Sequence, residues 1–227
     1  MKKLQLLGLI VLLSLPLVLQ LTPLEILKLK VFDSWIKDQD PSGYFTVLNI
    51  TEQDVRDEGG WPFPRDQLAE IHMQLLERGA MGVGYVIAFS EPDRFGGDEA
   101  FANVLGMHPS ILAMFETDNQ QYPPTTGTVI LGDDVGGVML QGATQNVEIL
   151  RDSAYQGISS APIDVDGLTR RLPLLMRTPD GWVPAFGTQI LKVLAGADTY
   201  IINTNDNGIQ EIRVKGPPAV KTDSLGR

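Results

Sequence analysis

The sequence predicts an α/β domain with a mixed central sheet covered by helices, preceded by one N-terminal transmembrane helix. Three observations support this prediction. Residues 4–24 contain no charged side chain over 21 positions, strand-type and helix-type hydrophobic patterns then alternate along the chain, and turns rich in glycine and proline separate them. Because helices connect the short apolar segments, the alternation favours parallel strands in a layered architecture.

The uncharged segment 4–24 has the length of a membrane-spanning helix. At about 1.5 Å per residue it extends over roughly 31 Å, the thickness of a bilayer's hydrocarbon core. A cleaved signal peptide is the alternative, but the first alanine is Ala69, so no Ala-x-Ala cleavage site lies near the segment. Lys2 and Lys3 precede it, and the positive-inside rule therefore places residues 1–3 in the cytoplasm and residues 25–227 outside. We expect a single-pass protein of the inner (plasma) membrane with a periplasmic or extracellular domain.

Composition restricts the classes of function. The formal charge of −10 argues against nucleic acid as a partner. The absence of cysteine rules out disulfides, thiol nucleophiles and thiolate metal sites, and in an external domain it suggests a bacterial source. His72 and His108 lack the spacing of a zinc motif, and no G-x-S-x-G nucleophile elbow occurs. We therefore expect no enzyme activity in this chain, no catalytic residues, and no metal or cofactor.

The elements are predicted in chain order from periodicity and turn signals. The segment 44–50 (YFTVLNI) is typical of a buried strand, and with a helix at 66–78 and a strand at 81–89 it predicts a parallel βαβ unit. Two hairpins are indicated by the turn residues Thr178-Pro179-Asp180-Gly181 and by an Asn-Gly pair. The further predicted elements are helices 25–37, 98–105 and 184–194, strands 111–115 and 155–160, a long loop within 117–137, and hairpin strands 169–177 with 182–183 and 199–203 with 209–214.

The segment W-P-F-P-R at residues 61–65 is the least ordinary part of the chain. Its two prolines fix φ and remove two backbone donors, so the segment is stiff before folding. In a structural interpretation it closes one edge of the core, with Arg65 paired to Asp66 or Asp93. In a functional interpretation Trp61 forms one wall of a ligand pocket, and Arg65 contacts an anionic group.

Two turn segments resemble parts of calcium loops. One is Asp164-Val165-Asp166-Gly167, and the other places Asn203, Asn205 and Asn207 before a glycine. The position that would carry a bidentate glutamate in the second is Val214, so a β-turn explains both segments with fewer assumptions. Arg170 and Arg171 follow the first turn, and in a strand one would face solvent while the other pointed inward to form an ion pair.

Four segments together resemble the second type of CHASE domain, the extracellular sensory domain of bacterial cyclases and histidine kinases. The two most specific elements are W-P-x-P-R at residues 61–65 and D-x-D-G-x-x-R-x-x-P at residues 164–173. The matching segments are LEILKLKVFD (24–33), VLNITEQDVRDEGGWPFPRDQLAEIHMQLLERGA (47–80), MGVGYVIAFSEPD (81–93) and APIDVDGLTRRLPL (161–174). The family's first strand usually ends in an acid, where this chain has Ile50 and Thr51, and its second strand carries an aspartate where this chain has Val86.

The resemblance implies a membrane-anchored sensory or ligand-binding domain that acts in signal transduction and works as a homo-oligomer, with a dimer expected first. It implies a small-molecule or protein ligand. In relatives a further strand, membrane helices and an output domain follow, so it implies either a chain truncated at its C-terminus or a reduced relative. The alternative function is a structural or assembly subunit of a membrane complex. The candidate ligand-binding residues are Trp61, Arg65, Asp93, Asp166, Arg170 and Arg171.

Overall fold

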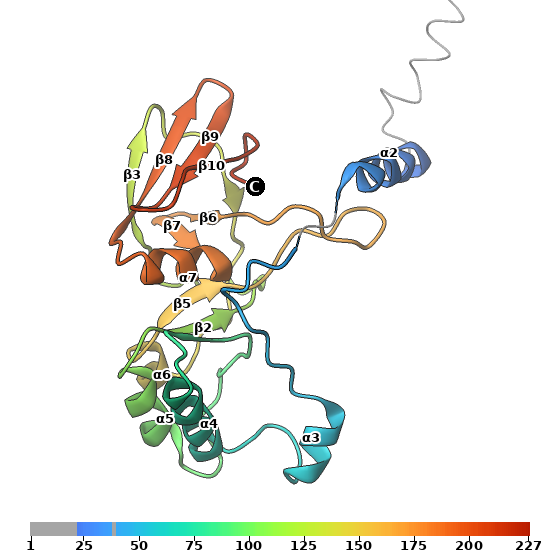
Figure 1. Ribbon diagram of the computed structural model, residues 1–227. Coiled ribbons are helices and arrows are strands. Elements are labelled where there is room, and N and C mark those ends of the chain that lie inside the picture. Colours follow the sequence, from blue (N-terminus) through green and yellow to red (C-terminus); the bar gives the residue numbers. More distant parts are fainter. Residues whose placement is uncertain (1–21, 38–39) are drawn as a thin grey trace, which may run out of the picture. The chain divides into compact units, whose positions relative to one another are not determined.

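The computed structural model describes residues 22–37 and 40–227 (Figure 1). The chain divides into two compact units. Residues 1–49 and 162–170 form the first, which we name the entry unit. Residues 50–161 and 171–227 form the second, which we name the main unit.

The described part of the entry unit contains helix α2 and a tight loop at residues 162–170. Helix α2 covers Thr22–Trp35, which confirms the helix predicted over 25–37. The loop turns at Gly167, whose φ is +85°, and the Gly167 N–H donates to the Asp164 carbonyl oxygen at 2.9 Å. The transmembrane prediction for residues 4–24 falls almost wholly on residues outside the described part. Within the described residues, no helix combines the length and apolarity needed to cross a bilayer.

The strand predicted at residues 44–50 does not form. These residues are exposed and belong to no strand, so the βαβ unit predicted from them is wrong. Strand propensity measures how well a side chain fits a pleated, half-buried surface, and it is realised only where a pairing partner exists. The chain instead forms helix α3, Glu52–Asp57, where the Thr51 hydroxyl accepts from the Asp54 N–H and the Asp54 carboxylate accepts from the Thr51 N–H.

A parallel three-stranded sheet lies at the centre of one part of the main unit. Strands β1 (Val83–Tyr85), β2 (Ser110–Met114) and β5 (Tyr155–Ile158) pair in the order β1-β2-β5. Here β1, helix α5 (Asp98–Leu105) and β2 make the βαβ unit. Helices α4 (Arg65–Glu77), α5 and α6 (Glu148–Arg151) pack on one face through a buried core that includes Phe89, Phe101, Leu105, Leu112 and Leu150 (Figure 1).

Helix α7, Phe186–Leu194, covers the other face of this sheet. Strand alternation turns Tyr85 and Leu112 toward the first core and leaves Gly84 and Gly157 under α7. Cβ atoms built at these glycines would lie 2.8 Å from the Phe186 ring and 2.7 Å from the Phe186 Cα, respectively. The glycines therefore allow the close approach of α7, and the layering confirms a sheet covered by helices.

The remaining strands form two further sheets. The prediction of one mixed central sheet is therefore corrected as well. The orders are β10-β9-β8-β3 and β4-β6-β7. Both predicted hairpins are confirmed, as β6 with β7 and β8 with β9. Strand β3 lies inside the predicted loop 117–137, because a short apolar run there alternates in burial and pairs with β8. The bounds are β3 Gly127–Leu131, β4 Val138–Met139, β6 Leu175–Thr178, β7 Gly181–Pro184, β8 Thr199–Asn205, β9 Gly208–Arg213 and β10 Val220–Lys221.

Candidate functional site

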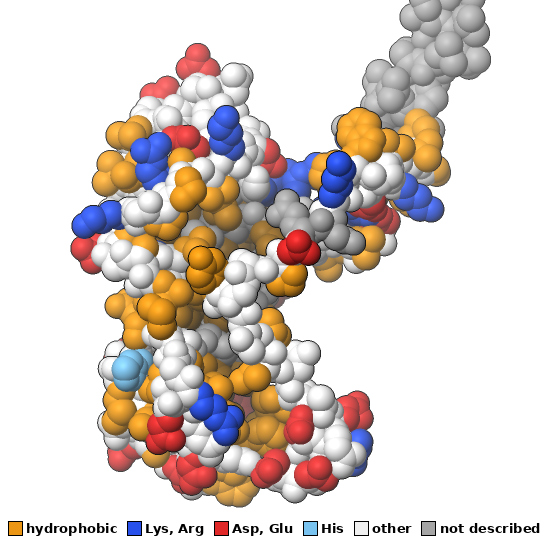
Figure 2. Space-filling view, viewed as in Figure 1, with side chains coloured by type: hydrophobic (Ala, Val, Ile, Leu, Met, Phe, Trp, Pro, Cys, Tyr) orange, Lys and Arg blue, Asp and Glu red, His pale blue; other side chains and the backbone are white. Residues whose placement is uncertain are grey.

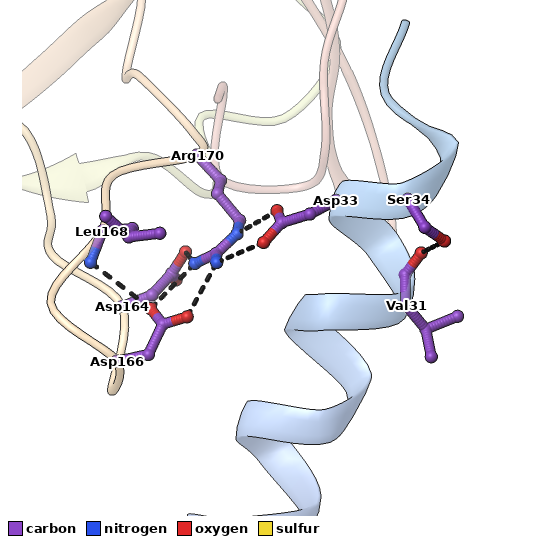
Figure 3. A network of polar contacts seen from close by, with 7 residues as sticks. All are labelled: Val31, Asp33, Ser34, Asp164, Asp166, Leu168 and Arg170. Atoms are coloured by element: carbon purple, nitrogen blue, oxygen red, sulfur yellow. Dashed lines mark hydrogen bonds and ion pairs between the residues drawn. The ribbon is translucent and has the colours of Figure 1, made fainter.

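An ion cluster centred on Arg170 joins helix α2 to the loop of the entry unit (Figure 3). We name it the Arg170 cluster, and it consists of Asp33, Asp164, Asp166 and Arg170. Asp33 comes from the last turns of α2, whereas the other three residues lie within seven positions of one another in the loop. The loop folds back on itself because the Asp164 N–H donates to the Leu168 carbonyl oxygen at 2.9 Å and the Leu168 N–H donates to the Asp166 carboxylate at 3.3 Å.

All five guanidinium N–H groups of Arg170 have carboxylate acceptors. Nε and Nη2 donate to the two oxygens of Asp33 at 2.6 and 2.8 Å. Nη1 and Nη2 donate to the two oxygens of Asp166 at 2.9 and 2.7 Å. Nη1 also donates to Asp164 at 3.1 Å. Two bidentate pairs on one planar group fix both partners in orientation as well as in distance.

The cluster holds three carboxylates around one guanidinium, and its geometry keeps Asp33 and Asp166 ionised. The Arg170 side chain is only 4% exposed. Hydrogen bonds from Arg170 lower the pKa of Asp33 below its ordinary value, and they lower the pKa of Asp166 to about 2. In return, the hydrogen bonds to Asp33 and Asp166 raise the pKa of Arg170. With three carboxylates around one guanidinium, the cluster carries a formal excess of negative charge.

A second cluster, in the main unit, surrounds Arg65 at the start of α4. The Arg65 N–H donates to Asp93 Oδ2 at 2.9 Å, and Nε lies 3.5 Å from Asp98 Oδ1. Nη2 donates to the Glu91 carbonyl oxygen at 3.4 Å, and the guanidinium carbon lies 4.5 Å from the centre of the buried Phe89 ring. We name these contacts the Arg65 cluster. The Arg65 side chain is only 8% exposed. The geometry therefore supports the structural interpretation, in which Arg65 packs against the core.

Asp93 organises the backbone around this second cluster. Its carboxylate accepts from the N–H groups of Arg65, Phe95 and Gly97, and its own N–H donates to Asp98 Oδ2 at 2.8 Å. Burial acts to raise the pKa of Asp93, but the backbone hydrogen bonds outweigh it, so the pKa lies below its ordinary value. Burial lowers the pKa of Arg65, against the opposing effect of Asp98 and Asp93.

Trp61 differs from Phe63 and Arg65 in the same segment because it is exposed. Trp61 is 46% exposed, whereas Phe63 is buried. The two rings meet edge to face, with centroids 5.2 Å apart. Phe63 therefore packs in the core, whereas Trp61 remains an exposed aromatic residue.

The six predicted site residues do not gather at one place. Asp166 and Arg170 belong to the Arg170 cluster, and Arg65 and Asp93 belong to the Arg65 cluster. Trp61 contacts Phe63, and Arg171 belongs to the main unit ahead of β6. Sequence reasoning missed Asp33 and Asp98 as cluster members. Asp33 is the last residue of the first segment that resembles the CHASE family, and this position could have marked it as a site residue. No sequence motif marked Asp98.

Two open hollows in the main unit are lined by other residues. One, of about 490 Å³, is lined by residues 105–110 and 152–155. Another, of about 630 Å³, lies between α4 and α5 and is lined by Asp66, Ala69, Glu70, Met73, Gln74, Ala100 and Val104. Among the described residues, no group of three or more histidine, aspartate or glutamate side chains could hold a metal ion. Asp164 and Asp166 instead bind Arg170, and Asn205 accepts from the Asn207 N–H at 2.9 Å in the β8–β9 turn.

The sheets are flanked by helices, so the chain is of the layered α/β class. The two ion clusters connect sequence motifs that are distant along the chain. A model of the CHASE2 domain matches residues 7–224. The chain therefore belongs to the CHASE2 domain family, whose members are extracellular sensory domains of signalling proteins. No curated protein and no solved structure matches the chain.

Proposed function

We propose that the chain is the extracytoplasmic sensory domain of a bacterial signal-transduction protein, anchored by a single membrane-spanning helix at residues 4–24. Membership of the CHASE2 family supports the sensory role. The uncharged segment and the two lysines before it support the anchor and its orientation. In this proposal the chain binds a ligand and has no catalytic residue, metal or cofactor of its own, and catalysis belongs to an output domain of the signalling protein.

The Arg170 cluster is the observation that carries this proposal. Helix α2 begins at Thr22, within the last three residues of the predicted span, and Asp33 on α2 is held by two short hydrogen bonds to Arg170 (Figure 3). The loop that supplies Arg170 also supplies Asp164 and Asp166. A ligand that displaces this loop would therefore move α2, and through α2 the span, because a bidentate ion pair transmits orientation.

Thiol labelling in intact cells tests the location. The chain has no cysteine, so one introduced cysteine reports one position. Thr46→Cys, at an exposed residue, should react with a membrane-impermeant maleimide applied from the periplasmic side. A cysteine inserted after Met1, which keeps both lysines, should react only after lysis. The opposite pattern, or recovery of the Thr46→Cys protein in the soluble fraction, would contradict the proposal.

A further inference from the structure

His72 is a histidine enclosed in the core of the main unit. It lies on α4 and is 0% exposed. Its Nδ1 lies 3.0 Å from the hydroxyl of Tyr85 on β1, and the two rings stack with centroids 5.9 Å apart. Tyr85 in turn meets Phe89 and Phe101 edge to face. The imidazole therefore belongs to a group of aromatic rings that all lie in the main unit.

The contacts of the His72 ring suit a neutral imidazole. With the ring proton on Nε2, Nδ1 accepts a hydrogen bond from the Tyr85 hydroxyl. Nε2 is buried and has no hydrogen-bond partner among the residues that the structure describes. A second proton on Nδ1 would turn this acceptor into a donor. It would also place a positive charge in an apolar core, which is costly unless an anion is paired with it.

No carboxylate of the described residues is paired with His72, since Nδ1 faces Tyr85 and Nε2 has no partner. Burial raises the pKa of Tyr85, so its hydroxyl stays neutral, and His108 in the loop before β2 opposes a second positive charge. Asp98 on α5 lies 3.5 Å from Arg65, with which it is paired. Acidic side chains lie at the surface of the part of the main unit that contains these helices (Figure 2). The remaining acidic residues of α4, α5 and α6 are exposed: Asp66, Glu70, Glu77, Glu99 and Glu148.

Mild acid should therefore destabilise the core around His72. Burial lowers the pKa of His72 below its ordinary value of 6.5, and the nearby His108 lowers it further. The unfolded chain then takes up this proton at a higher pH than the folded chain. The contribution of His72 to stability is thus complete above about pH 6.5 and is lost as pH falls from there toward the folded pKa. This window lies above the range below about pH 5 in which the carboxylates of the Arg170 cluster respond.

We propose that His72 is an acid-sensitive switch built into the core of the main unit. Mild acid protonates the ring, and α4 then separates from β1, so that the imidazolium reaches water and the Tyr85 hydroxyl no longer donates to Nδ1. The stimulus is a proton, and the responding element is α4 with the aromatic core beneath it. Only the use of this switch as a signal of external acidity rests on the proposed function, because the switch itself does not require the membrane anchor.

Urea titrations of the full-length chain at about pH 7.5 and about pH 5.5 test the switch. In the parent, the urea midpoint should fall by about 0.5 M or more at the lower pH. His72→Asn keeps an acceptor for the Tyr85 hydroxyl but cannot take up a proton, so its midpoint should be equal at the two pH values. His108→Asn changes the other histidine of the chain, which is exposed, and as the matched control it should keep the fall. Equal midpoints in the parent, or an equal fall in His72→Asn, would overturn the proposal.

A measurement without a substitution in the core decides the question if His72→Asn does not fold. The histidine Cε1–H signals of the full-length chain are assigned by NMR with His108→Asn, which leaves only the signal of His72. In the parent, this signal should titrate with a midpoint below pH 6.5. The protection of the backbone amides of α4 and β1 against hydrogen exchange should fall in step with it. Titration at or above pH 6.5, no titration before acid unfolding, or unchanged protection would contradict the switch.

Discussion

At the scale of single residues, Arg170 is the side chain on which the entry unit depends. Its five donors meet three carboxylates, and two of these pairs are bidentate. A lysine would carry the same charge but offers a compact ammonium without the planar fork, so it could not orient Asp33 and Asp166 together. The arrangement thus depends on the shape of the guanidinium as much as on its charge.

The pH dependence of this cluster follows from the carboxylates. Asp166 has a pKa lowered from 3.8 to about 2, and the pKa of Asp33 is lowered as well. A carboxylate with a lowered folded-state pKa contributes stability above its unfolded pKa and loses it as pH falls through the folded value. The cluster should therefore be unchanged between about pH 8 and pH 5 and should open between about pH 4 and pH 2.

Spin-label mobility measures this opening. A nitroxide on Lys37→Cys reports the segment that follows α2, and one on Lys215→Cys, an exposed position of the main unit, reports acid unfolding elsewhere. We expect the Lys37 label to become more mobile below about pH 4, at or before any change at Lys215. A rise in mobility at Lys37 near neutral pH would mean that a group other than these carboxylates controls the segment.

Arg65 should act on stability. Arg65→Ala removes one partner of a buried ion pair and a cation–π contact with Phe89. It should lower the free energy of unfolding by roughly 3 kcal/mol in a urea titration. Arg94→Ala, which removes an exposed arginine stacked on Phe95, should change it by less than about 0.5 kcal/mol. A folded Arg65→Ala protein of normal stability would return Arg65 to the ligand-binding interpretation.

At the scale of elements, the close contact between β5 and α7 depends on a residue without a side chain. A Cβ at Gly157 would lie 2.7 Å from the Phe186 Cα and 2.9 Å from its N. Both are backbone atoms, so they cannot move without displacing α7. Gly157→Ala should therefore lower the free energy of unfolding by about 1–3 kcal/mol in denaturant titrations.

Gly187→Ala is the control for this prediction. Gly187 lies in the first turn of α7, and a Cβ there meets nothing within 4 Å. Alanine favours a helix over glycine by up to about 1 kcal/mol, so this variant should be as stable as the parent or more stable. If Gly157→Ala behaved like Gly187→Ala, the packing of α7 on the sheet would be looser than described.

The observed elements show which sequence signals are enough to predict secondary structure. Helices α4, α5 and α7 and both hairpins followed from hydrophobic periodicity and from turn residues, which are local signals. The segment 44–50 has equally strong strand character, yet it lies exposed outside any strand. Strand pairing is a long-range event, so local composition could identify an apolar extended segment but could not supply its partner.

At the scale of the whole molecule, the sequence separates pieces that the fold brings together. Asp33 and Arg170 are 137 positions apart, and each lies in a segment that carries the CHASE resemblance. The resemblance could identify the family and could mark both segments. It could not show that they meet, because the contact depends on a loop closed by its own hydrogen bonds around Gly167.

The same reasoning explains why Arg65 and Arg170, two of the six candidate residues, lie in different clusters. Arg65 and Arg170 each lie in a family motif, and sequence alone treats them alike. Only the structure shows that Arg65 packs on Phe89 within the main unit while Arg170 holds α2. We therefore expect the Arg65 cluster to act on stability, and the Arg170 cluster holds α2 to the loop of the entry unit.

Hydrogen exchange along α2 tests this link most directly. In the full-length chain, Arg170→Lys should increase the exchange rate of backbone amides at residues 25–35 at least tenfold, because the bidentate contact with Asp33 is lost. Arg213→Lys, at an exposed pair with Glu211, should leave these amides unchanged. If α2 exchanges at the same rate in both variants and the parent, Arg170 does not hold the helix, and the central claim is contradicted.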